Sequence, residues 1–136
     1  MKLAEVFAQV NAQEDKEMGY VFDAPVHYIV LNRKDNTWTQ STITKYLAIL
    51  DQIEASTGPG VMVTIGTGAR HFSSGFSLPH WVKDKKNMFE SIQMFQDLLA
   101  RVMTFPMPTF CVMNGNAIAG GYILSLAHDW RMMNGK

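Results

Sequence analysis

The 136-residue sequence predicts an α/β fold in which helices cover a largely parallel β-sheet. Short apolar runs of strand length alternate with longer segments whose apolar residues recur at helical spacing. Residues 61–65 form a nearly continuous apolar run, as in parallel strands covered on both faces. Glycine-rich segments follow two of these runs, where an α/β sheet places its strand-to-helix loops. The expected order is therefore β-β-α-β-α-β-α-β.

The first part of the chain predicts a pair of strands and a helix. The β-rich runs 20–22 and 26–31 flank a turn that contains Pro25. Apolar side chains at helical spacing predict an amphipathic helix over 39–56, which the sequence Thr-Gly-Pro-Gly then ends. For residues 1–16 the sequence leaves a short helix and a mobile tail as alternatives.

The rest of the chain continues the alternation of strands and helices. Proline residues after position 105 end one helix and begin the next strand. The expected elements are a strand at 61–65, a loop over 69–79, a helix over 87–103, a strand at 110–113, a short helix over 122–127 and a strand from 130.

The composition excludes several classes of partner. Lysine and arginine total 12 and aspartate and glutamate total 12, so no net charge attracts nucleic acid or an anionic membrane. No apolar run approaches the roughly 20 residues needed to cross a bilayer. Cys111 is the only cysteine and lies in an apolar run, so it is expected to be a small buried side chain.

Two glycine-bearing loops stand where a ligand is expected, and neither matches a nucleotide motif. The segment 115–122 begins like a phosphate-binding loop, but Gly121 and Tyr122 replace its lysine and hydroxyl residue. The segment 66–71 lacks the third glycine of a dinucleotide fingerprint. What remains is a pair of loops that can offer backbone N–H donors to one negatively charged oxygen.

The histidines do not predict a metal site. His27, His71, His80 and His128 are scattered without helical metal spacing, and there is no second cysteine. Each is expected to be a surface or capping residue. Asp129 follows the last predicted helix and is expected to hold backbone N–H groups rather than to abstract protons.

Three segments in register resemble the crotonase (enoyl-CoA hydratase/isomerase) superfamily. They read FSSGFSL from Phe72, MNGNAIAGG from Met113 with SLAHDWR from Ser125, and LNR from Leu31 at the end of a strand. The resemblance covers residues 20–134. It implies a crotonase-like spiral of β-β-α units, truncated before the C-terminal part, with residues 1–19 as an N-terminal extension and 20–136 as a partial domain.

The resemblance also implies the site. Carried over by position, the family's two oxyanion-hole donors fall on the backbone N–H groups of Phe76 and Gly120. In the family these donors hold the thioester oxygen of an acyl-CoA, which is a substrate, so neither a metal nor a separate cofactor is implied. The loop 73–78 and residues 36–39, which include Asn36, are expected to line the CoA arm. The residues expected to bind the substrate there are Ser74, Gly75, Ser77, Leu78, Trp38 and Thr39.

A departure from the family pattern narrows the implied activity. Ile123 stands where the hydratases carry a glutamate, and an apolar side chain cannot activate water. The sequence most resembles the Δ3-Δ2-enoyl-CoA isomerases, which convert 3-enoyl-CoA to 2-trans-enoyl-CoA in fatty-acid β-oxidation. Their catalytic carboxylate lies beyond the strand that begins near Trp130. Because Glu90 and Asp129 do not match its position, the base is expected outside this chain.

Two other functions stay open beside the isomerase. One is a catalytically inactive crotonase-like subunit that serves a larger assembly by binding CoA or by structure, and the other is a hydratase-type enzyme. The family resemblance implies a trimer-based homo-oligomer, or other chains that cover the truncated face, and a mitochondrial or peroxisomal location.

Overall fold

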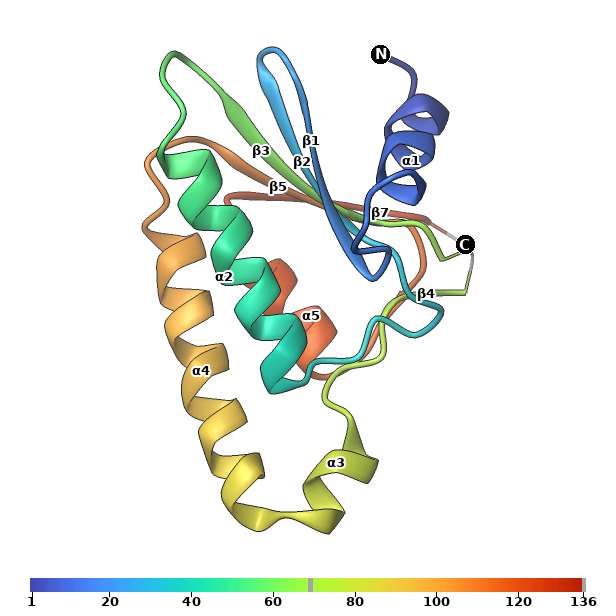
Figure 1. Ribbon diagram of the computed structural model, residues 1–136, viewed down its shortest axis with the longest axis vertical. Coiled ribbons are helices and arrows are strands. Elements are labelled where there is room, and N and C mark those ends of the chain that lie inside the picture. Colours follow the sequence, from blue (N-terminus) through green and yellow to red (C-terminus); the bar gives the residue numbers. More distant parts are fainter. Residues whose placement is uncertain (69, 136) are drawn as a thin grey trace.

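The computed structural model describes residues 1–68 and 70–135, and its centre is a five-stranded sheet (Figure 1). The strand order is β1-β2-β3-β5-β7, in which β1 and β2 are antiparallel and the other neighbours are parallel. This arrangement confirms the largely parallel sheet and the initial strand pair. The strands are β1 Met18–Asp23, β2 Val26–Leu31, β3 Val61–Gly66, β5 Thr109–Met113 and β7 Trp130–Met133.

Helices α2 (Gln40–Glu54), α4 (Lys85–Met103) and α5 (Gly120–Leu126) cover one face of this sheet, and α2 and α4 lie side by side (Figure 1). Their apolar stripes and one face of the strands form the main core. Its fully buried members include Ile29, Leu31, Ile43, Leu50, Ile53, Met62, Leu98 and Leu124.

Helix α1 (Leu3–Asn11) packs on the opposite face and decides between the two alternatives for residues 1–16. Val6 and Val10 are fully buried and belong to a second cluster with Val30. Successive side chains of a strand point to opposite faces, so Val30 lies on the other side of the sheet from its neighbours in the main core. The N-terminal residues therefore form a helix docked on the sheet.

The segment 69–79 was predicted to be a loop, and this prediction is wrong in two places. Residue 69 itself lies outside the described residues. The segment contains the short strand β4 (His71–Ser73) and the start of α3 (Leu78–Lys83). Strand β4 pairs with β6 (Asn116–Ala117), and a contact so distant in sequence leaves no local pattern. Pro79 was expected to close a loop, but it lies in the first turn of α3, where a missing N–H is tolerated.

Other predicted boundaries move by a few residues because capping groups set them. Thr39 caps α2. Asp84 caps α4, which begins at Lys85, two residues before the expected start. Helix α5 begins at Gly120 rather than at residue 122. Strand β1 begins at Met18 rather than at residue 20.

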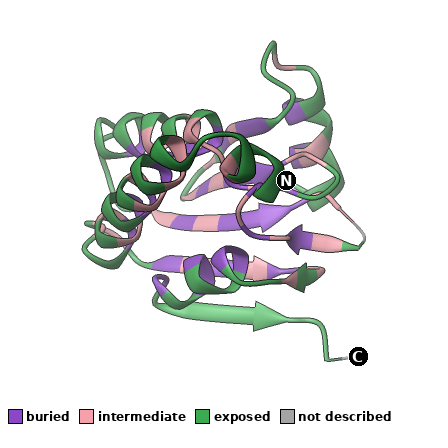
Figure 2. Cartoon of the chain, turned by 90° about the horizontal axis from the view of Figure 1, so that it is seen from below, coloured by how far each residue is buried: buried purple, intermediate pink, exposed green. Residues whose placement is uncertain are grey.

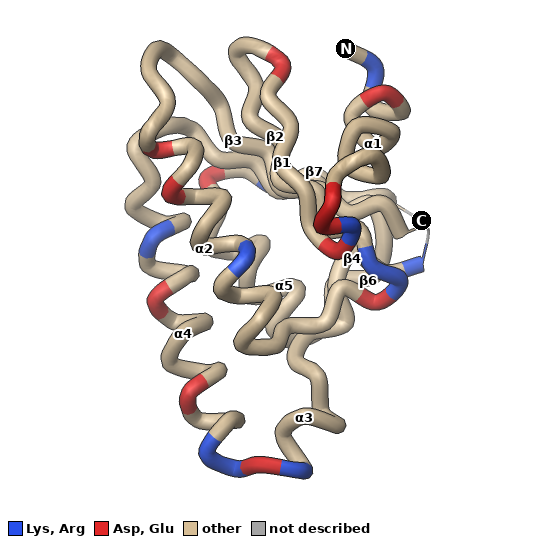
Figure 3. The backbone as a smooth tube through the Cα atoms, viewed as in Figure 1, with Lys and Arg blue, Asp and Glu red and all other residues tan. Residues whose placement is uncertain are grey.

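Charged residues of both signs lie along α2 and α4 (Figure 3). Arg101 of α4 lies 2.8 Å from Asp51 and 3.2 Å from Glu54 of α2, so these pairs link the two helices at the surface. None of the helices within residues 1–68 and 70–135 is long and apolar enough to cross a membrane.

Strand β7 forms an exposed edge of the sheet (Figure 2). All four of its residues are exposed, and the ring of Trp130 stacks on Phe110 of β5 at a centroid distance of 4.9 Å. The sheet therefore presents unpaired backbone groups and apolar side chains along this edge.

Two histidines are buried, although each was expected to be a surface or capping residue. His27 is neither, whereas His128 bonds the Leu124 carbonyl near the end of α5 and so fits the capping alternative. His27 is 2% exposed and lies among the rings of the β1–β2 pair, with Nδ1 2.8 Å from the Tyr20 hydroxyl. His128 is 3% exposed and lies on the face of the sheet that α2 covers. The sequence placed His128 at a helix end. It gave no sign of the hydrogen-bond partner on β3 that makes the burial of His128 favourable.

That partner belongs to a buried chain of hydrogen bonds. The Tyr46 hydroxyl of α2 lies 2.7 Å from Thr64 Oγ1 of β3, which lies 2.9 Å from His128 Nε2. His128 Nδ1 lies 2.9 Å from the Leu124 carbonyl of α5, which can only accept. Nδ1 therefore donates, Nε2 of the neutral ring accepts from Thr64, and Thr64 accepts from Tyr46.

Burial lowers the pKa of His128 to about 4, against an ordinary value of 6.5. The folded state thus favours the neutral ring. The resulting contribution to stability is complete above pH 6.5 and is lost as the pH falls toward 4.

We expect His128 to make folding sensitive to acid. Between pH 7.5 and pH 4 the free energy of unfolding should fall by about 3 kcal/mol more in the wild type than in His128→Gln. Urea titrations of both proteins across this range measure the difference. His27 and the carboxylates are present in both proteins, so equal slopes would contradict the assignment to His128.

Candidate functional site

The segment 72–78 lies against the loop that follows β2. Trp38 N–H donates to the Gly75 carbonyl at 2.8 Å, and Ser77 N–H donates to the Trp38 carbonyl at 3.0 Å. These bonds form a parallel bridge between Trp38 and Phe76. In such a bridge the flanking residues pair with Trp38, so the N–H of Phe76 itself points to the opposite side.

On that side lies the start of α5. A Cβ built on Gly75 would lie 3.2 Å from the Gly120 nitrogen and 2.9 Å from the Ile118 carbonyl oxygen. Gly75 also has φ +88°, a left-handed conformation that favours glycine. Both properties require a glycine here, and together they let the two loops approach closely.

The two donors expected from the sequence have no acceptor among the described residues. Gly120 is the first residue of α5, so its N–H has no acceptor within the helix. Within residues 1–68 and 70–135, neither the Gly120 N–H nor the Phe76 N–H donates a hydrogen bond to the protein. The fold brings Phe76 and Gly120 together and leaves both N–H groups available to a ligand.

Aromatic rings surround this pair of donors. The Phe76 ring lies 4.5 Å from that of Trp81 and 4.9 Å from that of Phe95, as centroid distances. A Cβ on Gly120 would lie 3.2 Å from the Phe76 ring and 3.5 Å from Cδ1 of Trp38. A low-dielectric setting of this kind strengthens a hydrogen bond to a negative oxygen.

The remaining expected site residues fall into two groups. Trp38, Gly75 and Ser77 are buried, and the Thr39 hydroxyl is engaged in capping α2 by accepting from Thr42 N–H at 3.2 Å. The others are more accessible: Ser74 is half-buried with its hydroxyl on the Asp35 carbonyl, and Leu78 is 65% exposed at the start of α3.

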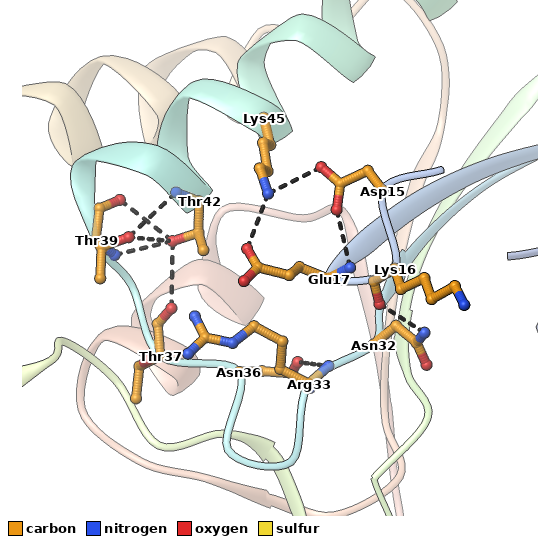
Figure 4. Close-up of polar contacts among 10 residues, drawn as sticks. All are labelled: Asp15, Lys16, Glu17, Asn32, Arg33, Asn36, Thr37, Thr39, Thr42 and Lys45. Atoms are coloured by element: carbon orange, nitrogen blue, oxygen red, sulfur yellow. Dashed lines mark hydrogen bonds and ion pairs between the residues drawn. The ribbon is translucent and has the colours of Figure 1, made fainter. Parts of the chain in front are cut away.

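Asn36 belongs to the segment 36–39 expected to line the CoA arm, and its side chain holds that segment against residues 72–73 (Figure 4). Its Oδ1 accepts from Arg33 N–H at 2.7 Å, and its Nδ2 donates to the Phe72 carbonyl at 2.9 Å. Ser73 Oγ donates back to the Asn36 carbonyl at 2.8 Å. Asn36 has a φ of 46°, a left-handed conformation that asparagine adopts more readily than most residues.

Nearby, Lys45 of α2 pairs with Asp15 and Glu17 at 2.8 Å each (Figure 4). Its hydrogen bond to Asp15 is the main reason that the pKa of Lys45 is raised. These partly exposed pairs tie the start of α2 to the segment before β1.

Other reactive side chains have structural surroundings. Burial raises the pKa of the Cys111 thiol to about 12, so this residue is not an activated nucleophile. Asp129 Oδ2 accepts from the N–H of Thr109 at 2.9 Å, which confirms the expected anchoring role. In the part of the chain that the structure describes, no three His, Cys, Asp or Glu residues gather as a metal cluster.

A separate cavity lies away from the two donors. It has a volume of about 450 Å³ and opens between the ends of β5 and β7, lined by Arg70, Asn114, Asn116, Tyr122 and Met133 among others. Neither donor lines it. A smaller crevice of about 10 Å³ reaches Trp38 from the loop after β2.

The sequence of the chain matches a known protein family. Residues 21–136 match the model of a family described as enoyl-CoA hydratase/isomerase. The chain belongs to this family. The crotonase-like fold expected from the three sequence segments is thereby confirmed.

Relatives of known sequence include two proteins of Arabidopsis thaliana. The chain is 36% identical over 98 residues to "Enoyl-CoA delta isomerase 3" and 32% identical over 100 residues to "Enoyl-CoA delta isomerase 2, peroxisomal". Each match covers 68% of this chain, but only 40% and 41% of the respective relatives. The chain thus spans less than half the length of either protein.

Solved structures share the fold. An enoyl-CoA hydratase from Bacillus anthracis has a TM-score of 0.81 at 26% identity, covering 86% of this chain and 47% of that one. Pseudomonas aeruginosa DspI has a TM-score of 0.82 at 21% identity, covering 89% and 47%.

The close contact of α5 with β4 makes a prediction about two adjacent glycines. A Cβ on Gly121 would lie 2.5 Å from the Ser73 carbonyl oxygen, whereas on Gly120 it would meet a side-chain ring at 3.2 Å. Gly121→Ala should therefore lower the free energy of unfolding by about 1–3 kcal/mol, and Gly120→Ala by less. Urea unfolding midpoints measure both effects. The same midpoint for the two variants would show that β4 and α5 are not packed as described.

Proposed function

We propose that this chain takes part in the isomerisation of 3-enoyl-CoA to 2-trans-enoyl-CoA by holding a thioester enolate. The observation that carries the proposal is the pair of neighbouring N–H groups of Phe76 and Gly120, both without an acceptor within residues 1–68 and 70–135. The relatives named as enoyl-CoA delta isomerases support this activity.

The chemistry follows from the charge that develops. Removal of a C2 proton from a 3-enoyl thioester moves an electron pair toward the carbonyl and produces a dienolate oxygen. Return of the proton at C4 leaves the double bond between C2 and C3. Donors fixed in place before the reaction stabilise that oxygen, and each is typically worth roughly 3–4 kcal/mol in the transition state.

Ile123 favours isomerisation over hydration. It lies on the first turn of α5, three residues after Gly120, and its side chain is 46% exposed. An apolar group here cannot deprotonate water, whereas isomerisation needs no attacking water. The catalytic base is proposed to come from outside residues 1–136, in keeping with the share of the relatives that this chain spans.

The same proposal extends to partners and place. An acyl-CoA would bind with its thioester at the two donors and its CoA arm along Ser74, Gly75, Ser77, Leu78, Trp38 and Thr39. Assembly as a trimer-based homo-oligomer, or with other chains, would cover the exposed edge at β7. One relative is named peroxisomal, which supports peroxisomes as one of the two expected compartments.

The test is the conversion of 3-octenoyl-CoA by this chain together with the segment or partner chain that supplies the proposed base, followed by the absorbance of the conjugated thioester. We expect turnover by the wild type and a loss of about 10²-fold in kcat for Gly120→Pro, which removes one donor N–H. Gly120→Ala keeps the N–H, and Lys85→Pro places proline at the first position of α4, so both should retain activity.

Other results would redirect the assignment. Octenoyl-CoA that binds without turnover, measured by calorimetry, would favour the inactive CoA-binding subunit. Unchanged kcat in a folded Gly120→Pro variant would remove Gly120 from the site.

A further inference from the structure

Trp38 carries a buried donor that the fold does not use. Its side chain is 1% exposed, yet its Nε1 has no hydrogen-bond partner within the described residues. Buried N–H groups in native proteins are nearly always paired, because an unpaired one loses its bond to water without replacement. An exception of this kind needs an explanation.

Neither ring neighbour of Trp38 accepts a hydrogen bond from its Nε1. Phe95 lies 5.6 Å away, as a centroid distance, and has no polar atom. Tyr46 meets the indole edge-on at 5.9 Å, and its hydroxyl lies 2.7 Å from Thr64 in the buried chain of hydrogen bonds. The indole is thus packed by apolar surfaces, and its N–H is not satisfied by them.

The five-membered ring of the indole lies near the donor pair. A Cβ built on Gly120 would lie 3.5 Å from Cδ1 of Trp38. Cδ1 is bonded to Nε1 in an indole, so the five-membered ring that carries the N–H lies close to Gly120. The backbone of Trp38 also pairs with the residues on both sides of Phe76. Three unpaired N–H groups, from Trp38, Phe76 and Gly120, therefore gather in one part of the molecule.

We propose that the indole N–H of Trp38 donates a hydrogen bond to a carbonyl oxygen of a bound acyl-CoA. This inference rests on the proposed function and adds a side-chain donor to its two backbone donors. Acyl-CoA offers such oxygens in its thioester and in the two amides of its pantetheine arm. Free CoA has the amides and lacks the thioester, so comparing the two ligands identifies the acceptor.

The first experiment removes the donor and measures binding by calorimetry with octanoyl-CoA and free CoA. Trp38→Phe should weaken octanoyl-CoA binding by about 3- to 10-fold, the size expected for one hydrogen bond. If the acceptor is the thioester, free CoA binds as before, and if it is an amide, both ligands weaken. Trp130→Phe on the exposed strand β7 is the matched control and should leave both affinities unchanged.

A second variant separates the hydrogen bond from packing. Replacing the indole of Trp38 by benzothiophene keeps the shape of the ring and removes the N–H, so it stays informative where Trp38→Phe does not fold. It should weaken octanoyl-CoA binding to a similar extent.

A spectroscopic signal completes the test. In ¹⁵N-labelled wild-type protein the indole resonance of Trp38, identified by its absence in the variant, should move downfield when octanoyl-CoA is added. An unmoved resonance together with full affinity of the benzothiophene variant would overturn the role of Trp38 and leave the proposed function intact. A wild type that binds no octanoyl-CoA would overturn both.

Discussion

The orientation of the candidate site depends on two hydrogen bonds at Trp38. Its N–H donates to the Gly75 carbonyl and its carbonyl accepts from the Ser77 N–H. The N–H of Phe76, which lies between Gly75 and Ser77, therefore points away from Trp38 and toward α5. The Trp38 ring, in turn, lies in the core between Tyr46 of α2 and Phe95 of α4. Core packing and site geometry therefore share one residue.

A second set of contacts holds the opposite side of the site. The hydrogen bonds from Tyr46 through Thr64 to His128 and Leu124 connect α2 to α5 across β3. Tyr46 of α2 thus contacts Trp38, which orients Phe76, and also begins the series of hydrogen bonds that reaches α5. The relative position of the two backbone donors is fixed by buried contacts on both sides, as preorganised electrostatic stabilisation requires.

Most of the fold could be predicted from local patterns. The apolar run of β3 and the helical spacing in α2 and α4 are properties of neighbouring residues, and the structure contains each element within a few positions of its expected place. The resemblance of the segments around Phe76 and Gly120 supplied the pairing of two loops that lie far apart in the sequence.

What could not be predicted depends on distant partners. Strand β4 exists because β6 lies beside it, and His128 is buried because Thr64 and Leu124 satisfy both of its ring nitrogens. Pro79 was predicted to lie in a loop. A proline is also well suited to the first turn of a helix, and this is where Pro79 lies in α3. Asn36 was expected in the segment that lines the CoA arm, but the three hydrogen bonds of its side chain depend on residues brought near it by folding.

The donors assigned to the site belong to the peptide backbone, and this has an evolutionary consequence. Every residue except proline supplies an N–H, so the side chains at positions 76 and 120 are limited by the space around them rather than by the hydrogen bonds themselves. Selection for such a site acts on conformation, through Gly75 with its φ of +88° and through the close packing at Gly121. Substitutions other than proline at these two positions therefore leave both peptide N–H groups in place, as long as the backbone keeps its conformation.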